Sequence, residues 1–238
     1  MSGVATPQLA LRLGFPDAAR FGNFVAGTNA EALATLQAVA AGAHAGPIYL
    51  WGEPGCGRSH LLQAACAAAD ARGAGCGYVP LASVVRELPP AMLDGLDELD
   101  LVCVDDLDAA AGDEPWQEAL LHLYNRRRDR HRALVLAGRF APAAMPLALA
   151  DLRTRLGWGP VFRIAPADDA AMIEALAQRA RGRGLELPEP VARYLLSRCR
   201  REMGALLAQL DQLDAAALAA QRALTVPFVR AWLDQAPR

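Results

Sequence analysis

A short glycine-rich segment constrains the fold of this chain more than any other feature. Residues 52–59 read Gly-Glu-Pro-Gly-Cys-Gly-Arg-Ser, which is the spacing G-x-x-x-x-G-[basic]-S. An apolar run at 47–51 precedes it and a helical pattern at 57–71 follows, so the segment joins a strand to a helix. Glycines let backbone N–H groups turn inward around a polyphosphate, and the helix N-terminus adds the positive end of its dipole. The segment predicts a phosphate-binding loop, with a ligand-free strand-to-helix turn as the alternative.

This loop supplies the first candidate ligands of a nucleotide. The hydroxyl of Ser59 can ligate Mg²⁺, whereas Arg58 stands where such loops usually carry Lys. Lys is a compact point charge, and the wider planar guanidinium of Arg favours holding a nucleotide over hydrolysing it rapidly. All 24 basic residues of the 238-residue chain are Arg, so a compositional bias is the alternative explanation for Arg58. The expected nucleotide-binding residues here are Gly52, Gly55, Gly57, Arg58, Ser59 and His60.

Strands and helices alternate around the loop. Further apolar runs predict strands at 77–81, 101–104, 133–137 and 161–164, and helical spacing predicts helices at 28–41 and 114–130. This alternation is typical of an α/β fold, a parallel sheet with helices on its faces. After Pro166 the pattern is helical only, at 168–181, 188–198, 202–221 and 227–234. We expect an extended segment (1–20), an α/β nucleotide-binding domain (21–165) and a small all-helical domain (166–238).

Two carboxylates follow the strand predicted at 101–104. Asp105 and Asp106 come directly after four apolar residues, at the strand end that should face the phosphate loop. Asp105 would hold Mg²⁺ through water together with Ser59, and Asp106 would orient or deprotonate an attacking water. The alternative is that an Asp caps a helix at an exposed turn.

Composition excludes several classes of protein. A net charge of −2 and a pI near 6.1 argue against a strongly basic nucleic-acid-binding domain. No stretch approaches about 18 consecutive apolar residues. Because no basic stretch followed by an apolar run opens the chain either, neither a membrane span nor a secretory signal is expected. The five cysteines include no C-x-x-C pair, so we expect reduced thiols in a cytoplasmic protein.

A dense basic run lies near the end of the helix predicted at 114–130. Its five arginines could contact the phosphates of a nucleic acid. The alternative, which we prefer, is a solvated helix end with Arg near the negative pole of the helix dipole. The run consists of Arg126, Arg127, Arg128, Arg130 and Arg132.

Five segments resemble the initiator clade of AAA+ proteins and, within it, the Hda family of short DnaA homologues. They are residues 21–27, the loop at 52–59, and residues 104–107, 152–159 and 201–229. The resemblance implies an AAA+ domain followed by a helical lid, with ADP or ATP and possible Mg²⁺ bound. It also implies DnaA and the DNA polymerase sliding clamp as partners, with DNA reached through the clamp, and a possible homo-oligomer. Direct sequence-specific DNA binding is not implied.

The resemblance assigns roles to individual residues. Arg155 matches the arginine finger, which stabilises charge on the γ-phosphate of a neighbouring subunit's nucleotide, with Arg153 as the alternative. Arg201 matches the second sensor, a lid arginine that reaches the bound nucleotide, with the adjacent Arg200 as the alternative. The first-sensor segment, residues 136–139, reads Leu-Ala-Gly-Arg and lacks the usual polar residue, which weakens the case for efficient hydrolysis.

The N-terminal segment resembles the clamp-binding peptide of the same family. Its pattern Q-L-x-L-x-L offers a Gln amide and apolar anchors, at Gln8, Leu9, Leu11 and Leu13, although alternating Leu could also form an edge strand. Together these features favour an Hda-like regulator that binds ADP and the DNA-loaded clamp and stimulates ATP hydrolysis by DnaA, preventing re-initiation of replication. Little or no hydrolysis by the chain alone is expected. The alternatives are an autonomous P-loop ATPase that loads or remodels a protein, and a DnaA paralogue acting as a pure adaptor.

Overall fold

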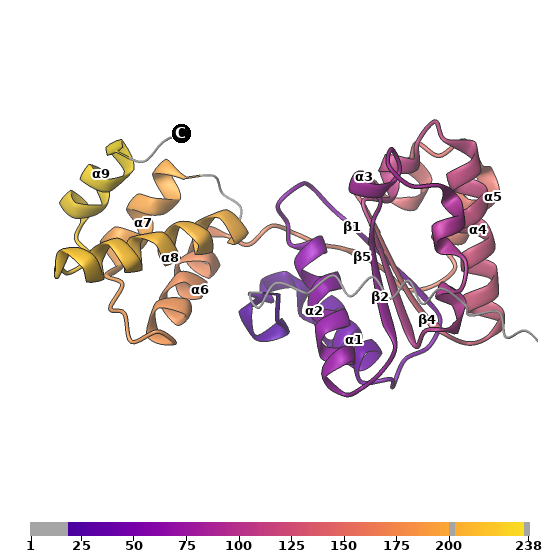
Figure 1. Cartoon of the computed structure of the whole chain (residues 1–238), viewed down its shortest axis with the longest axis horizontal. Helices are drawn as coiled ribbons and strands as arrows, with labels where there is room; N and C mark the ends of the chain where they lie inside the picture. The colour runs from indigo at the N-terminus through magenta and orange to yellow at the C-terminus, as the bar shows by residue number, and fades with distance from the viewer. Residues whose placement is uncertain (1–18, 200–202, 236–238) are drawn as a thin grey trace, which may run out of the picture. The chain divides into compact units, whose positions relative to one another are not determined.

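The computed structural model describes residues 19–199 and 203–235, which form two compact units (Figure 1). The α/β unit contains Glu31–Gly52 and Arg58–Ile164. The helical unit contains Gly22–Ala30, Glu53–Gly57 and the described residues from Ala165 onward. Within the described residues, no helix has both the length and the apolar content that crossing a bilayer requires.

A five-stranded parallel sheet forms the centre of the α/β unit. The strands are β1 (Pro47–Trp51), β2 (Cys76–Pro80), β3 (Leu101–Asp105), β4 (Ala133–Gly138) and β5 (Val161–Arg163), in the spatial order β2-β3-β4-β1-β5. Every residue of β3 and β4 is buried, as expected for strands covered on both faces. The register places Trp51, the last residue of β1, opposite Gly138 of β4 and Arg163 of β5. The α/β fold class predicted from the sequence is confirmed.

Helices cover both faces of this sheet. Figure 1 shows α1 (Ala30–Ala40) and α2 (Arg58–Ala71) on one side and α4 (Glu114–Asp129) and α5 (Ala150–Arg155) on the other. The N-terminus of α4 is fixed by Asp113, whose carboxylate accepts a hydrogen bond of 3.2 Å from the backbone N–H of Trp116. Trp116 and Tyr124 of α4 are wholly buried against the apolar residues of β3 and β4. The α4 face of the core therefore fixes the position of α5 as well, because α5 packs on α4.

Short elements connect these helices and strands. Leu81, predicted as the end of a strand, instead begins α3 (Leu81–Val84), because β2 ends at Pro80. The 3₁₀ helices are η1 (Phe21–Asn23), η2 (Gly27–Asn29), η3 (Pro90–Leu93), η4 (Leu96–Glu98), η5 (Leu107–Ala110) and η6 (Pro142–Ala144). Neither these turns nor α5 is among the elements that the sequence pattern predicts.

The helical unit contains four longer helices. They are α6 (Asp169–Arg181), α7 (Glu189–Arg198), α8 (Met203–Ala220) and α9 (Val226–Gln235). Asp168 caps α6 by accepting a 2.7 Å hydrogen bond from the backbone N–H of Ala171. Buried leucines from α6, α7 and α8 form a core of their own, which explains the helical periodicity seen after Pro166. The predicted small helical region is confirmed.

The basic run at the end of α4 makes hydrogen bonds and ion pairs with neighbouring segments of the α/β unit. The expectation of a solvated helix end is wrong for Arg127. The Arg127 side chain is wholly buried. Its guanidinium donates to four backbone carbonyls, those of Leu96, Leu99, Asp100 and Ala133. The hydrogen bonds of Arg127 therefore hold the segment between η4 and β3 against the C-terminal end of α4.

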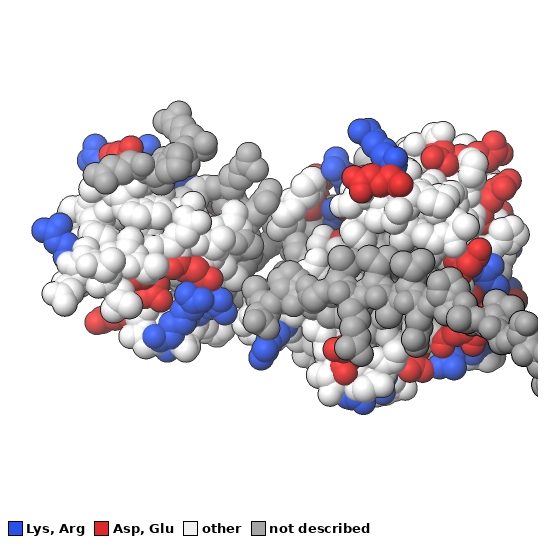
Figure 2. All heavy atoms as spheres, in the orientation of Figure 1, with Lys and Arg blue, Asp and Glu red and all other residues white. Residues whose placement is uncertain are grey.

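The neighbours of Arg127 in the run pair with acids of the same segment. Asp97, itself buried, lies 3.4 Å from Arg126 Nε and 2.6 Å from Arg130 Nη1. Arg132 Nη1 lies 2.5 Å from Asp100 Oδ1. Arg and acidic side chains are also intermingled on the face of the α/β unit drawn in Figure 2. This pairing weakens the reading of the run as a phosphate-binding patch.

Candidate functional site

The predicted phosphate loop connects β1 to α2 and depends on glycine at two points. Gly55 and Gly57 have φ angles of +79° and +100°, in the region that side chains rarely adopt. A Cβ atom added at Gly57 would lie 2.7 Å from the ring of Phe24. Gly52, directly after β1, is buried. The glycines thus give the loop a backbone path that larger residues would block.

Arg58 begins α2 and carries an unsatisfied cationic group. The residue is only 6% exposed, and its Nη1 atom is buried without a hydrogen-bond partner among the described residues. An unpaired buried donor of a charged group is costly. An anionic ligand such as a phosphate would satisfy it, so the donor set fits the phosphate groups of a nucleotide.

The two residues after Arg58 have different environments. Ser59 is exposed in the first turn of α2, and its hydroxyl is accessible for a metal or a phosphate. His60 Nε2 lies 3.0 Å from the backbone carbonyl of Arg20, so this nitrogen donates. Burial lowers the pKa of His60, which keeps the imidazole neutral at physiological pH. His60 therefore anchors the backbone near α2, and its predicted contact with a nucleotide stays a prediction.

Asp105 ends β3 as a firmly held, buried carboxylate. Its Oδ2 accepts a 2.8 Å hydrogen bond from the Tyr78 hydroxyl, and its Oδ1 accepts one of 2.9 Å from the backbone N–H of Asp106. Each oxygen retains a second lone pair. Asp105 can therefore hold a water of a metal ion without losing these two bonds.

Asp106 follows in a left-handed conformation, with φ of +52°. It precedes η5 without any side-chain capping bond, which contradicts the helix-cap alternative for this residue. Burial, followed by the charge of Asp105, raises the pKa of Asp106, and the nearby cations Arg58 and Arg139 oppose that rise. Asp106 is thus an ionisable group inside a cluster of acidic and basic side chains.

The structure adds Asp108 and Arg139 to this cluster. Asp108 accepts a 3.0 Å hydrogen bond from the backbone N–H of Arg139 and lies 3.3 Å from its Nε. Its charge also acts on Asp106 and on the buried Tyr49, whose hydroxyl donates to the Phe140 carbonyl at 2.6 Å. Asp108 is not among the site residues predicted from the sequence, although its place three residues after Asp105 offered a signal.

Within the first-sensor segment, residues 136–139, Gly138 is closely surrounded by other side chains. A Cβ added at Gly138 would lie 2.6 Å from Met145 Cε and 2.8 Å from the Tyr49 hydroxyl oxygen. A side chain at residue 138 would therefore require the ends of the Met145 and Tyr49 side chains to move.

A metal ion would depend on the nucleotide for most of its ligands. Among the described residues, no group of three or more His, Cys, Asp or Glu side chains is placed to hold a metal. Mg²⁺ commonly uses one or two protein ligands together with waters and phosphate oxygens. Ser59 and Asp105 suit that kind of site, so the residues fit Mg²⁺ delivered with a nucleotide.

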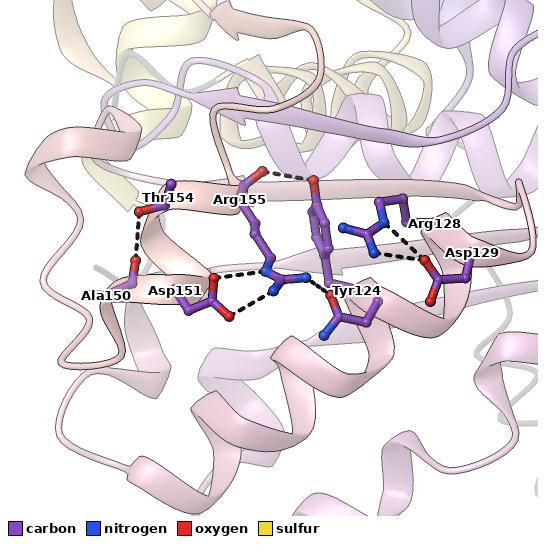
Figure 3. Close-up of polar contacts among 8 residues, drawn as sticks. Tyr124, Arg128, Asp129, Ala150, Asp151, Thr154 and Arg155 are labelled. Carbon is purple, nitrogen blue, oxygen red and sulfur yellow. Dashed lines mark hydrogen bonds and ion pairs between the residues drawn. The ribbon is translucent and has the colours of Figure 1, made fainter.

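The predicted arginine finger lies at the end of α5, in ordered surroundings (Figure 3). Arg155 Nε and Nη2 donate to the two carboxylate oxygens of Asp151 at 3.0 and 2.8 Å, and Nη1 donates to Asn125 Oδ1. The backbone carbonyl of Arg155 accepts a 2.8 Å hydrogen bond from the Tyr124 hydroxyl. The alternative residue, Arg153, donates to the backbone carbonyl of Leu147 at 3.0 Å.

Several predicted site residues lie outside the described part of the chain. They are the clamp-peptide residues Gln8, Leu9, Leu11 and Leu13, and the lid-sensor candidates Arg200 and Arg201. Their roles stay predictions.

Solved structures of replication and recombination proteins share this fold. Domain III of Thermotoga maritima DnaA is 20% identical with a TM-score of 0.78, over 92% of this chain and 97% of that one. AMPPCP-bound DnaA from Aquifex aeolicus is 22% identical with a TM-score of 0.70, over 84% of this chain and 66% of that one. The Thermotoga maritima RuvB branch migration motor is 14% identical with a TM-score of 0.64, over 87% and 67%. At these identities the likeness shows the fold alone.

Two family models match the sequence itself. The bacterial DnaA ATPase domain matches residues 16–163, which is more than half of the chain, and the Hda lid domain matches residues 169–233. The two matches follow each other in the order of an ATPase domain and its lid. The chain therefore belongs to the bacterial DnaA ATPase-domain family of AAA+ proteins and has the domain architecture of Hda.

Proposed function

We propose that this chain is an Hda-type regulator of replication initiation. It holds ADP, or ATP, at its own phosphate loop and binds the DNA-loaded sliding clamp through Gln8, Leu9, Leu11 and Leu13. In that state it offers Arg155 to ATP bound by DnaA, promotes hydrolysis and prevents re-initiation. The matches to the DnaA ATPase domain and the Hda lid support this proposal.

One contrast within the α/β unit carries the proposal. Arg155 is ordered by side chains of α4 and α5, as a group that stabilises a transition state should be. The chain's own site has Arg58 in place of Lys, and its first-sensor segment, residues 136–139, lacks the usual polar residue. A chain with a prepared finger and a weakened site of its own is better suited to activate another subunit than to hydrolyse ATP rapidly.

The chain's own residues would hold a nucleotide as follows. Arg58 Nη1 would donate to a phosphate oxygen, and the loop from Gly52 through Gly57 would surround the phosphates. Ser59 and, through water, Asp105 would contact Mg²⁺, whose chemistry is to neutralise phosphate charge. Asp106 would orient a water, and Arg201 would reach the nucleotide from the lid region, residues 166–238.

Hydrolysis of ATP by DnaA tests the role of Arg155. Radiolabelled ATP bound to DnaA is followed with this chain and with clamp loaded on DNA. Wild type should accelerate hydrolysis and Arg155→Ala should lose at least about a hundredfold, as expected for a missing finger. Arg153→Ala serves as the matched control and should retain stimulation. Equal activity of Arg155→Ala and wild type would overturn the proposal, and fast hydrolysis by the isolated chain would favour the autonomous ATPase.

A clamp pull-down tests the N-terminal segment separately. Gln8→Ala and Leu9→Ala should each weaken capture of the clamp, because the amide and the apolar anchor fill the peptide groove. Arg12→Ala, which changes a residue between two anchors, is the control. If a variant carrying both Gln8→Ala and Leu9→Ala captures the clamp as well as wild type does, clamp binding through this segment is removed from the proposal. The test of Arg155 is independent of that result.

A further inference from the structure

The side chain of Arg155 is held in one orientation by groups from three places in the chain. Asp151, one turn earlier on α5, accepts from Nε and Nη2 at 3.0 and 2.8 Å (Figure 3). Asn125 of α4 accepts from Nη1, and the Trp158 ring faces the guanidinium with its centroid 5.0 Å away. A guanidinium has five N–H donors. Described side chains accept from three of the five, so within this part of the structure two remain for a further acceptor.

This arrangement differs from an ordinary surface ion pair. Arg193 and Glu189 of α7 have the same i,i+4 spacing, at 2.6 Å, and side-chain exposures of 66% and 60%. The Arg155 side chain is only 15% exposed, whereas Asp151 is half-exposed. The bond to Asp151 raises the pKa of Arg155 and lowers that of Asp151, so both remain ionised across the physiological range. An isolated exposed pair contributes little to stability and holds its side chains loosely, whereas Arg155 has further contacts with Asn125 and Trp158 that fix the direction of its guanidinium.

Trp158 is the exposed member of the group of side chains around Arg155. It is 55% exposed although it is a large apolar residue, and Arg128 lies over the same ring at 5.5 Å. The edge of the α/β unit that carries Arg155 therefore presents an aromatic ring and two guanidinium groups. That chemistry suits the phosphate-bearing face of another subunit.

We propose that Asp151 is a positioning residue for Arg155. It fixes the guanidinium before a partner arrives and directs the two unused N–H groups outward, toward a phosphate oxygen of the nucleotide held by DnaA. This role rests on the function proposed above. Arginine side chains have large rotamer entropy, and ordering the side chain in advance is worth on the order of tenfold in rate.

The stimulation of DnaA hydrolysis by Asp151→Asn tests this role with the full chain and clamp on DNA. Asn keeps the size of Asp and removes the charge that draws two donors of Arg155. The maximal rate should fall about tenfold, while the chain concentration for half-maximal stimulation stays nearly unchanged. Asp151→Glu should recover part of the rate. The matched control is Glu189→Gln, which breaks the equivalent pair of α7 and should leave both quantities unchanged.

Three results would overturn the inference. The rate with Asp151→Asn could equal that of wild type, which would mean that Asp151 does not position Arg155. It could also exceed the wild-type rate, which would mean that Asp151 restrains Arg155. A change in the half-maximal concentration alone would assign Asp151 to docking. If Arg155→Ala stimulates normally, the proposed function itself fails, and that outcome is distinct from the loss of Asp151 alone.

Side-chain dynamics give a second test that needs no activity. ¹⁵N relaxation of the Arg155 Nε–H group should report a rigid side chain in wild type and a more mobile one in Asp151→Asn, at an unchanged thermal unfolding midpoint. Equal rigidity in both proteins would show that Asn125 and Trp158 suffice, and it would remove the positioning role from Asp151.

Discussion

Replacing the buried Arg127 should destabilise the α/β unit strongly. In the variant Arg127→Met the four carbonyls that accept from the guanidinium lose this donor, although the Leu96 carbonyl still accepts from the backbone N–H of Leu99 at 3.3 Å. Burial lowers the pKa of Arg127 to about 10, so the side chain is charged at neutral pH and its hydrogen bonds are charge-assisted. Each unsatisfied buried carbonyl costs about 1–3 kcal/mol.

The net cost is smaller than the sum of these four contributions. Methionine fills part of the space, and burying its side chain returns about 2 kcal/mol. Water can also reach the part of the segment around Asp100, which is half-exposed. We therefore expect the free energy of unfolding to fall by about 3–5 kcal/mol, the range found when one partner of a buried charged pair is removed.

Urea unfolding followed by tryptophan fluorescence measures this loss, since three of the four tryptophans lie in the α/β unit. Arg132→Met is the matched control, because Arg132 makes one exposed ion pair, 41% and 47% exposed, with Asp100. Its loss should be below about 1 kcal/mol. If Arg127→Met lowers the free energy of unfolding no more than the control does, Arg127 is not the residue that holds the segment before β3 in place.

Three further substitutions test the candidate site. Gly57→Ala places a Cβ 2.7 Å from the Phe24 ring at a residue with a φ of +100°. Titration calorimetry should therefore show ADP binding weakened about tenfold or more. The control Gly22→Ala has open space around the added Cβ and should bind ADP normally. Burial raises the pKa of Asp106 above its ordinary value of 3.8, so the ionised form destabilises the fold. The variant Asp106→Asn should therefore raise the thermal midpoint more at about pH 8 than at about pH 3, because protonation of the wild-type carboxyl removes that penalty as the pH falls. An equal shift at both pH values would contradict this. Gly138→Ser should lower the free energy of unfolding by about 1–3 kcal/mol by overpacking and should not increase hydrolysis by the chain.

The sheet and the phosphate loop could be predicted because their signals are local. Strands such as β3 and β4 are buried on both faces and therefore appear as uninterrupted apolar runs. The loop glycines are required by backbone geometry, which the residue type alone reports. The order of the strands could not be predicted, because it depends on which buried faces meet in the folded chain.

The meaning of the charged residues was much harder to predict. Arg127 and Arg128 are adjacent in the sequence, yet one is wholly buried and the other is 40% exposed. The helical period of α4 places Arg127 on the same face as the buried Leu120 and Leu123. The acceptors that make its burial possible come from the segment 96–100 and Ala133, whose positions are set by tertiary packing. The six residues of α5 show too short a pattern for a helical period, so the contacts of Arg155 could not be foreseen.

The absence of Lys from this chain has a different meaning at different positions. At Arg181, 64% exposed and 2.8 Å from Glu174, a Lys could form a similar ion pair, so compositional bias explains the Arg adequately. Arg127 distributes its donors over four carbonyls, and Arg155 engages both oxygens of Asp151; a Lys ammonium has three donors at one point and could not reproduce either geometry. Arg58 belongs with this second group, because its fork places Nη1 in a buried position where, among residues 19–199 and 203–235, it has no hydrogen-bond partner. The planar guanidinium at position 58 is therefore part of how the loop would hold a phosphate, whatever bias first introduced it.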